Sequence, residues 1–248
     1  MEFFFELPIW IWFIIVIAAF FSAVLHGATG MLGGILMTAI LSQIIGIKQA
    51  VPVMTCALVF SHASRTFLYW KNTDRKIVAR ILLFGFPTLI LGAYIFSYLD
   101  PKFIALVFVI FLILSFPVKY WARRNNIKTS IKVLSGASMV WGLLAGNVVG
   151  PGFFLAPFLL GTGMSRLTFV GTMATITLLM NIVKLVVFSS TEIMSYPLFT
   201  LGIVIGLISI PANWLGKSIL NKITDTRHLL VIDIFTVLII VNFIYLAI

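Results

Sequence analysis

Charged side chains are scarce in this sequence. Only 10% of its 248 residues are Asp, Glu, Lys or Arg, whereas 61% are hydrophobic and 14% are aromatic. A soluble domain has about a quarter charged residues and is roughly half apolar. A water-soluble protein of this size is therefore excluded, because its surface would remain largely apolar. With a mean hydropathy of +1.16, most of the chain is expected to lie in a lipid bilayer.

Cysteine and acidic residues are also nearly absent. The single cysteine, Cys56, lies in an apolar run, so the sequence has neither a disulfide framework nor the grouped thiols of a zinc site. The chain has seven acidic and seventeen basic residues, and no acidic residue lies in the glycine clusters described below. Their absence there argues against a carboxylate proton relay and a metal-dependent lipid enzyme. We expect no metal, no cofactor and no catalytic residue.

The net charge of +10 would suggest nucleic-acid binding in a soluble protein. Here the basic residues gather in short hydrophilic breaks between apolar runs, so we expect no nucleic-acid partner. The breaks delimit eight long helices and two shorter apolar segments bordered by glycines. The long helices are predicted at residues 7–25, 49–70, 77–99, 103–120, 133–149, 167–190, 196–215 and 229–248, and the short segments at residues 31–46 and 153–161.

The two short segments either cross the membrane or fold back as re-entrant hairpins, and the positive-inside rule distinguishes these arrangements. If both cross, thirteen of the seventeen basic residues face the cytoplasm, and Lys48 and Lys102 face outward. If both are hairpins, nine basic residues lie inside and six outside. Crossing fits the rule better, and it predicts ten segments with both chain ends outside the cytoplasm. The acidic N-terminus is unlike a signal peptide, so we expect the first helix to be retained.

An internal repeat emerges when the chain is compared with itself at an offset of 119 residues. Glycines then align with glycines, and a basic residue inside one apolar helix aligns with a basic residue inside another. The aligned pairs include Gly27 with Gly146, Gly33 with Gly152, His62 with Asn181, and Arg65 with Lys184. Glycines are frequent in membrane helices because they support close packing, which is the alternative interpretation for any single one. The common offset favours a repeat.

Five segments in each half give the two halves opposite orientations in the membrane, because five is odd. We therefore predict an all-α polytopic integral membrane protein with two inverted repeats, an organisation typical of secondary transporters. Residues 1–121 would form the first transmembrane repeat, residues 122–132 a basic cytoplasmic linker, and residues 133–248 the second transmembrane repeat.

The glycine clusters at residues 27–34 and 146–152 each precede a short segment. Glycine at this density interrupts a helix and exposes backbone N–H groups, and Pro151 prevents a continuous helix in the second cluster. The N-terminus of the helix that follows carries partial positive charge and unpaired donors, which suits an anion. The candidate anion-binding residues in these clusters are Thr29, Gly30, Gly33, Gly34, Asn147, Gly150 and Gly152.

Two basic residues lie inside apolar helices, Arg65 and Lys184, each close to a helix end. We expect them to attract or gate the anion; alternatively, their long side chains snorkel to the lipid headgroups. His62 and Asn181, three residues before them, complete the candidate binding residues. His26 and His62 are also candidates for a proton-responsive role, because an imidazole titrates near neutrality. A packed, hydrogen-bonded histidine is the alternative.

With these features together, the chain resembles the sulfite exporter TauE/SafE family of small polytopic bacterial transporters. Residues 27–34 with the short apolar segment after them, residues 47–51 and residues 146–157 carry the likeness, which covers nearly the whole chain. The resemblance implies outward transport, across the cell membrane, of a small sulfur-containing anion such as sulfite or an organosulfonate. Family members often have a proline after the first glycine cluster, whereas residues 35–38 lack one, so the first short helix is expected to begin or bend differently.

The sequence therefore predicts a multi-pass transporter that moves a small anion by alternating access, with the anion and the lipid bilayer as its partners. A passive anion channel is the nearest alternative, and it would differ in showing no response to a substrate gradient on the opposite side. An intramembrane enzyme and a non-transporting assembly subunit are alternatives from other classes. Product analysis would identify the enzyme, and a stable partner in mild detergent would identify the subunit.

Overall fold

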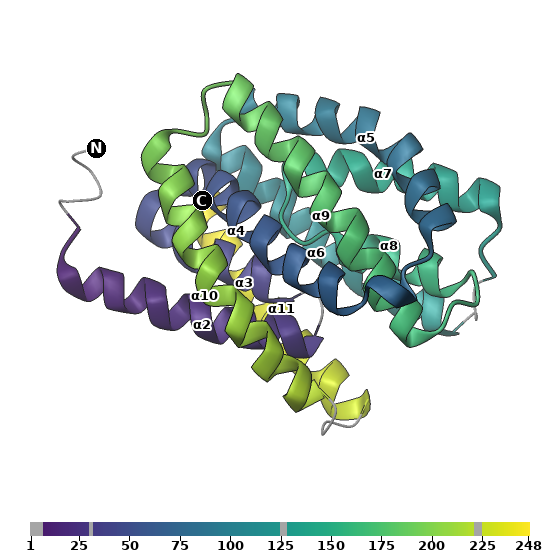
Figure 1. Ribbon diagram of the computed structural model, residues 1–248. Coiled ribbons are helices and arrows are strands. Elements are labelled where there is room, and N and C mark those ends of the chain that lie inside the picture. Colours follow the sequence, from purple (N-terminus) through teal and green to yellow (C-terminus); the bar gives the residue numbers. More distant parts are fainter. Residues whose placement is uncertain (1–6, 30–31, 125–127, 221–224) are drawn as a thin grey trace.

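The computed structural model describes residues 7–29, 32–124, 128–220 and 225–248 (Figure 1). Within these ranges the protein is all helical, with ten α-helices and one short 3-10 helix, η1. The elements in chain order are α2 (Ile9–Thr29), α3 (Leu32–Ile45), α4 (Ile47–Leu68), η1 (Trp70–Asn72), α5 (Arg75–Tyr98), α6 (Pro101–Arg124), α7 (Ile131–Asn147), α8 (Gly152–Leu160), α9 (Arg166–Ser190), α10 (Tyr196–Leu220) and α11 (Asp225–Ala247).

The predicted all-helical fold with eight long and two short segments is confirmed. The short segments are α3, with 14 residues, and α8, with 9 residues. The predicted helix bounds differ from the observed ones by up to five residues, and the difference at the first helix has a structural reason, because that helix does not end at Leu25. Instead α2 continues through Gly27 to Thr29, and a Cβ at Gly27 would collide with the backbone of Asn213 in α10. The glycine therefore serves close helix packing at this point and does not interrupt the helix.

In the part of the chain that the structure describes, six helices are individually long and apolar enough to cross a membrane, namely α2, α5, α6, α9, α10 and α11. The 22-residue α4 is less apolar, and it contacts α3, α9 and α10 while most of its residues are buried. A helix in that position faces protein more than lipid, so it tolerates polar residues such as His62 and Arg65. The protein is a multi-pass membrane protein, and its orientation in the membrane stays a prediction.

Three long helices begin at polar side chains in the hydrophilic breaks. Asp74 accepts hydrogen bonds from two backbone N–H groups at the start of α5, and Ser130 and Ser165 do the same for one N–H each at the starts of α7 and α9. Such caps satisfy donors that have no partner inside the helix. The breaks identified from charge are therefore also where the helices start.

The contacts between helices come in matched pairs. At the offset of 119 residues, α2 to α6 correspond to α7 to α11. As α2 packs on α10, so α7 packs on α5; as α4 packs on α10, so α9 packs on α5; and α3 meets α11 as α8 meets α6. Figure 1 shows α5 beside α7 and α2 crossing α10. Each half thus packs its first helix against the other half.

The closest helix approaches are matched in the same way. Gly27 lies against the backbone of Asn213, and Gly146 lies against the backbone of Gly92 and Ala93. These contacts support the internal repeat. Both glycines lie near the end of the first helix of their half, and each contacts the fourth helix of the other half, which is α10 for Gly27 and α5 for Gly146. The division into two inverted repeats and a linker stays a prediction, and residues 125–127 of that linker lie outside the described residues.

Candidate anion-binding site

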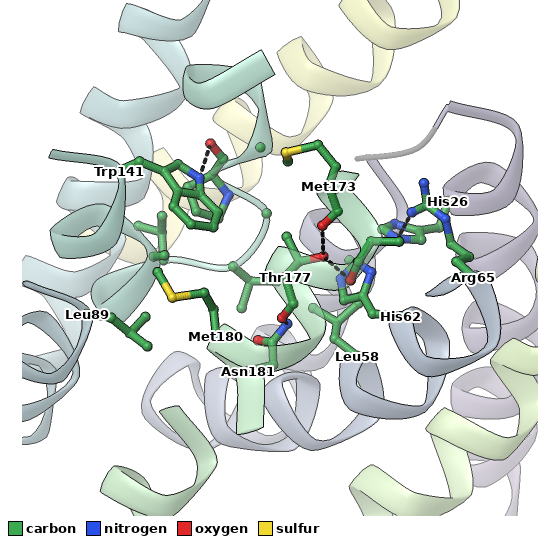
Figure 2. Close-up of a pocket in the computed structure, with 18 residues that line it drawn as sticks. His26, Leu58, His62, Arg65, Leu89, Trp141, Met173, Thr177, Met180 and Asn181 are labelled. Atoms are coloured by element: carbon green, nitrogen blue, oxygen red, sulfur yellow. Dashed lines mark hydrogen bonds between the residues drawn. The ribbon is translucent and has the colours of Figure 1, made fainter. Parts of the chain in front are cut away.

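A cavity of about 50 Å³, here called the large cavity, lies where α2, α4, α7, α8 and α9 meet (Figure 2). A single water needs roughly 10–15 Å³ on the same kind of measure, so the cavity has room for a small polyatomic ion. Both halves contribute to its wall, which includes residues of α4 from the first half and of α9 from the second.

One end of the large cavity is polar. Arg65 on α4 is only 7% exposed, and its Nη1 lies 3.0 Å from Nε2 of His26 on α2. A guanidinium has no acceptor, so Arg65 donates and His26 accepts. His26 is then a neutral imidazole with its proton on Nδ1, an atom that is buried and has no hydrogen-bond partner among the described residues. This end of the cavity therefore holds one full positive charge and an N–H donor.

A second imidazole lies beside this pair. The ring of His62, one turn before Arg65 on α4, meets the ring of His26 edge to face, with 5.3 Å between the ring centroids. Its Nδ1 is also buried without a hydrogen-bond partner among the described residues. Asn181 on α9 lines the cavity near them, and its Nδ2 donates to the backbone oxygen of Thr177 at 2.8 Å. Polar groups with spare hydrogen-bonding capacity thus converge on this end.

The N-terminus of α8 borders the same cavity. Residues 150–152 line it, and Gly150 has a φ of 74°, a conformation that favours glycine. Pro151 occupies the N-cap position and offers no side-chain hydrogen bond to the first turn of α8. The loop before α8 is fixed from α7, because Nε1 of Trp141 donates to the backbone oxygen of Pro151 at 3.0 Å. A helix N-terminus with uncapped amides therefore points its partial positive charge toward the cavity.

The other end of the cavity is apolar. Figure 2 shows Trp141, Leu89 and Met180 on the side away from His26 and Arg65. Among the described lining residues, Arg65 is the one that carries a full charge, and none is acidic. The arrangement suits a small monoanion that bears an apolar group, because one charge meets one charge and the remainder meets hydrocarbon.

Lys184 lies outside the large cavity. The residue is 2% exposed, and its ammonium donates to the backbone oxygens of Ala145, at 2.8 Å, and Val148, at 3.2 Å. These carbonyls end α7, where the helix dipole favours a cation. The side chain therefore does not snorkel to the headgroups. It joins α9 to the loop that leads into α8.

The structure brings six of the predicted binding residues to the large cavity: Gly34, His62, Arg65, Gly150, Gly152 and Asn181. Gly33 lies in the first turn of α3 and lines a separate small cavity. Asn147 is half-buried, and its Nδ2 donates to the backbone oxygen of Leu143. Gly30 lies outside the described residues.

Thr29 has a local role in the described structure. Its Oγ1 accepts from the backbone N–H of Leu32 at 3.2 Å and donates to the backbone oxygen of Leu25 at 2.7 Å. It therefore caps α3 and closes α2 with one hydroxyl. The N-terminus of α3 is in this respect unlike that of α8, which has no side-chain cap.

Sequence reasoning did not identify Trp141, Leu89, Met173 and Met180 as parts of the cavity, and it gave His26 a proton-responsive role without placing it among the binding residues. The four large apolar residues carry no signal, because any membrane helix is rich in such side chains. A signal for His26 did exist. His26 lies 39 residues before Arg65, and Ala145 lies 39 residues before Lys184. Both pairs are in contact, so His26 and Ala145 are equivalent positions of the repeat.

The sulfite exporter TauE/SafE family model matches residues 15–244, which is nearly the whole chain. No curated protein and no solved structure matches the chain.

Proposed function

The chain belongs to the sulfite exporter TauE/SafE family, and from that membership we propose that it transports a small sulfur-containing anion across the cell membrane by alternating access. The family consists of membrane transporters, and the fold fits a multi-pass transporter. The anion is bound in the large cavity, with both chain ends outside the cytoplasm.

The observation that carries the proposal is the meeting of two anion-binding elements from different halves of the chain. Arg65 comes from α4 in the first half, and the uncapped N-terminus of α8 comes from the second. Charge-assisted hydrogen bonds from a guanidinium are strong and suit an oxyanion. A helix N-terminus adds backbone donors aimed at the same negative charge.

The sulfonate class fits the cavity better than a dianion such as sulfate. A single guanidinium balances one negative charge, and the apolar wall formed by Leu89, Trp141 and Met180 would accept a short organic group. Burial of an uncompensated second charge would be expensive in these surroundings. We therefore expect methanesulfonate and related organosulfonates to bind more tightly than sulfate, with sulfite between them because part of it is monoanionic at neutral pH.

The experiment is a binding screen followed by a flux assay on the full chain. Purified protein in detergent is titrated with sulfite, sulfate, thiosulfate, methanesulfonate and acetate, and its thermal unfolding midpoint is recorded. A ligand that binds only the folded state raises that midpoint. We expect the largest rise with the sulfonate. The absence of any rise with every one of these anions would contradict the proposed binding site.

Flux into proteoliposomes distinguishes the transporter from a passive channel. A transporter that alternates between two faces shows saturable uptake that is accelerated by unlabelled substrate on the opposite side. We expect this acceleration with methanesulfonate. Unsaturable flux without the acceleration would favour the channel and contradict alternating access.

A further inference from the structure

A second, smaller cavity of about 20 Å³ lies among α2, α3, α4 and α10, and is here called the small cavity. At the offset of 119 residues, six of its lining residues correspond to residues that line the large cavity. Ser22 corresponds to Trp141, and Gly33 to Gly152. His26 and Leu58 belong to the walls of both cavities. The two cavities are therefore neighbours and are related by the internal repeat.

The buried cations of the two halves contact corresponding positions. Arg65 reaches His26, and Lys184 reaches Ala145, with 39 residues between the partners in each case. Position 145 is the counterpart of position 26. The acceptors differ. Arg65, which lines the large cavity, donates to an imidazole, whereas the ammonium of Lys184 donates to two backbone carbonyl oxygens at the end of α7.

The helix N-termini differ in the same sense. The N-terminus of α8 borders the large cavity without a side-chain cap, whereas Thr29 caps the N-terminus of α3 beside the small cavity. Thr29 is the counterpart of Val148, whose carbonyl oxygen accepts from Lys184. Lys184 is thus absent from the lining of the small cavity and the N-terminus of α3 is capped, so the counterparts of Arg65 and of the uncapped α8 are both engaged within the protein.

The small cavity also contains an unused polar group. Ser22 is 2% exposed, lines this cavity, and its Oγ has no hydrogen-bond partner among the described residues. Two other lining hydroxyls are engaged, since that of Ser61 accepts from Nδ2 of Asn213 and that of Ser209 donates to the backbone oxygen of Gly206. A buried hydroxyl without a partner is costly, and Ser22 can therefore form a hydrogen bond with a molecule that enters the cavity.

We propose that the small cavity is a second binding site for the same small monoanion, seen here in contracted form, and that the two cavities open alternately to opposite sides of the membrane. In the alternate state Lys184 leaves the carbonyls of α7 and binds the anion in the small cavity, as Arg65 does in the large one. Asn181 has there the role that His62 has in the large cavity, and Thr29 releases the N-terminus of α3. The second site rests on the proposed function, because it binds the same anion.

The test measures from which side each cavity is reached. In a Cys56→Ser background, Ser22→Cys reports on the small cavity and Thr177→Cys on the large one. Each variant is reconstituted in vesicles of known orientation and treated with a membrane-impermeant methanethiosulfonate reagent. The two cysteines should react from opposite sides. Saturating methanesulfonate, which does not attack the reagent, should slow the reaction of both cysteines, each on its own side, because it occupies both sites.

Lys184→Met tests whether Lys184 supports the second site. It should raise the methanesulfonate concentration that protects Ser22→Cys by about tenfold, the factor expected for one charge-assisted hydrogen bond, while Lys184→Arg restores the protection. A role limited to holding α7 would lower the unfolding midpoint but would not change the response of one cavity only. Each Lys184 variant is therefore also compared with its parent by thermal unfolding and by methanesulfonate binding in detergent.

The proposal is overturned if both cysteines react from the same side, if Ser22→Cys never reacts, or if Lys184→Met leaves the methanesulfonate response of Ser22→Cys unchanged. Detergent binding separates this failure from that of the proposed function. A parent protein that binds methanesulfonate but gives any of these results contradicts only the second site. A parent protein that binds none of the screened anions contradicts the proposed function itself.

Discussion

The two halves of this protein share most of their helix contacts but satisfy their polar groups differently. In the first half, α3 begins under the hydroxyl of Thr29, whereas in the second half α8 begins at Pro151 without a side-chain cap. Lys184 ends on the carbonyl oxygens of α7, whereas Arg65 reaches the imidazole of His26 at the wall of the large cavity. The helix packing is shared, and at these positions the two halves differ in a few hydrogen bonds.

The largest expected effect comes from removing the charge on the open side. Arg65→Gln removes the one fully charged residue among the described lining of the large cavity. We expect anion affinity and flux to fall roughly 10- to 100-fold, the range for one hydrogen bond to a charged group. Methanesulfonate titration and proteoliposome uptake measure this effect at matched protein abundance, and Arg65→Lys is the control that keeps the charge. Unchanged uptake by Arg65→Gln would remove Arg65 from the site.

The second prediction compares the stability contributed by the two equivalent glycine contacts between the halves. Gly27→Ala and Gly146→Ala each place a Cβ against the backbone of a helix in the other half. We expect each to lower the free energy of unfolding by about 1–3 kcal/mol, as overpacking does. Gly136→Ala is the control, because a Cβ there meets nothing within 4 Å. Thermal unfolding in detergent measures all three, and a loss in only one half would break the equivalence of the two contacts.

A smaller effect distinguishes the capped helix from the uncapped one. Thr29→Val removes the hydroxyl that caps α3, and we expect a loss of stability of about 1 kcal/mol, since N-cap removal costs roughly 0.5–2 kcal/mol. Binding of methanesulfonate in detergent should persist, because α8 and Arg65 are unchanged. Thr29→Ser restores the hydroxyl and should restore the unfolding midpoint. A loss of binding as large as that of Arg65→Gln would place Thr29 in the large-cavity site.

The smallest expected effect concerns the loop before α8. Trp141→Phe removes the hydrogen bond from Nε1 to the backbone oxygen of Pro151. A neutral hydrogen bond contributes roughly 0.5–1.5 kcal/mol, so we expect methanesulfonate affinity to fall about 2- to 10-fold as the loop loosens. Trp10→Phe is the control, because Trp10 is 58% exposed and outside the cavity lining. Equal affinity in both variants would mean that the indole donor does not position α8.

Much of the fold follows from local chemistry. Charge-poor runs locate the ten segments, and polar residues in the breaks, such as Asp74, Ser130 and Ser165, start three of the long helices. The end of α2 does not follow from local chemistry, because it depends on how Gly27 meets Asn213 in α10, 186 residues later in the chain. A glycine that breaks a helix and one that packs a helix read alike in sequence.

The residue types of the candidate site could be predicted from the sequence, but their hydrogen-bond partners could not. The repeat identified Arg65 and Lys184 as equivalent positions, and both are buried in the structure. Their different acceptors could not be inferred, because an imidazole and a pair of backbone carbonyls both suit a cation. Thr29 likewise has the residue type of an anion ligand, but the short reach to Leu32 makes it a cap in this structure.

The equal spacing of the two cation contacts has a consequence for the order in which the helices enter the bilayer. In both halves the acceptor precedes the cation by 39 residues, so α2 is synthesised before α4, and α7 before α9. Inserting an arginine or lysine in a membrane helix costs roughly 2.5–3.5 kcal/mol at the helix centre and less toward its ends, where Arg65 and Lys184 lie. Each buried cation is thus synthesised after the residue that accepts its hydrogen bond. When α4 and α9 enter the bilayer, α2 and α7, which carry the acceptors, are already synthesised.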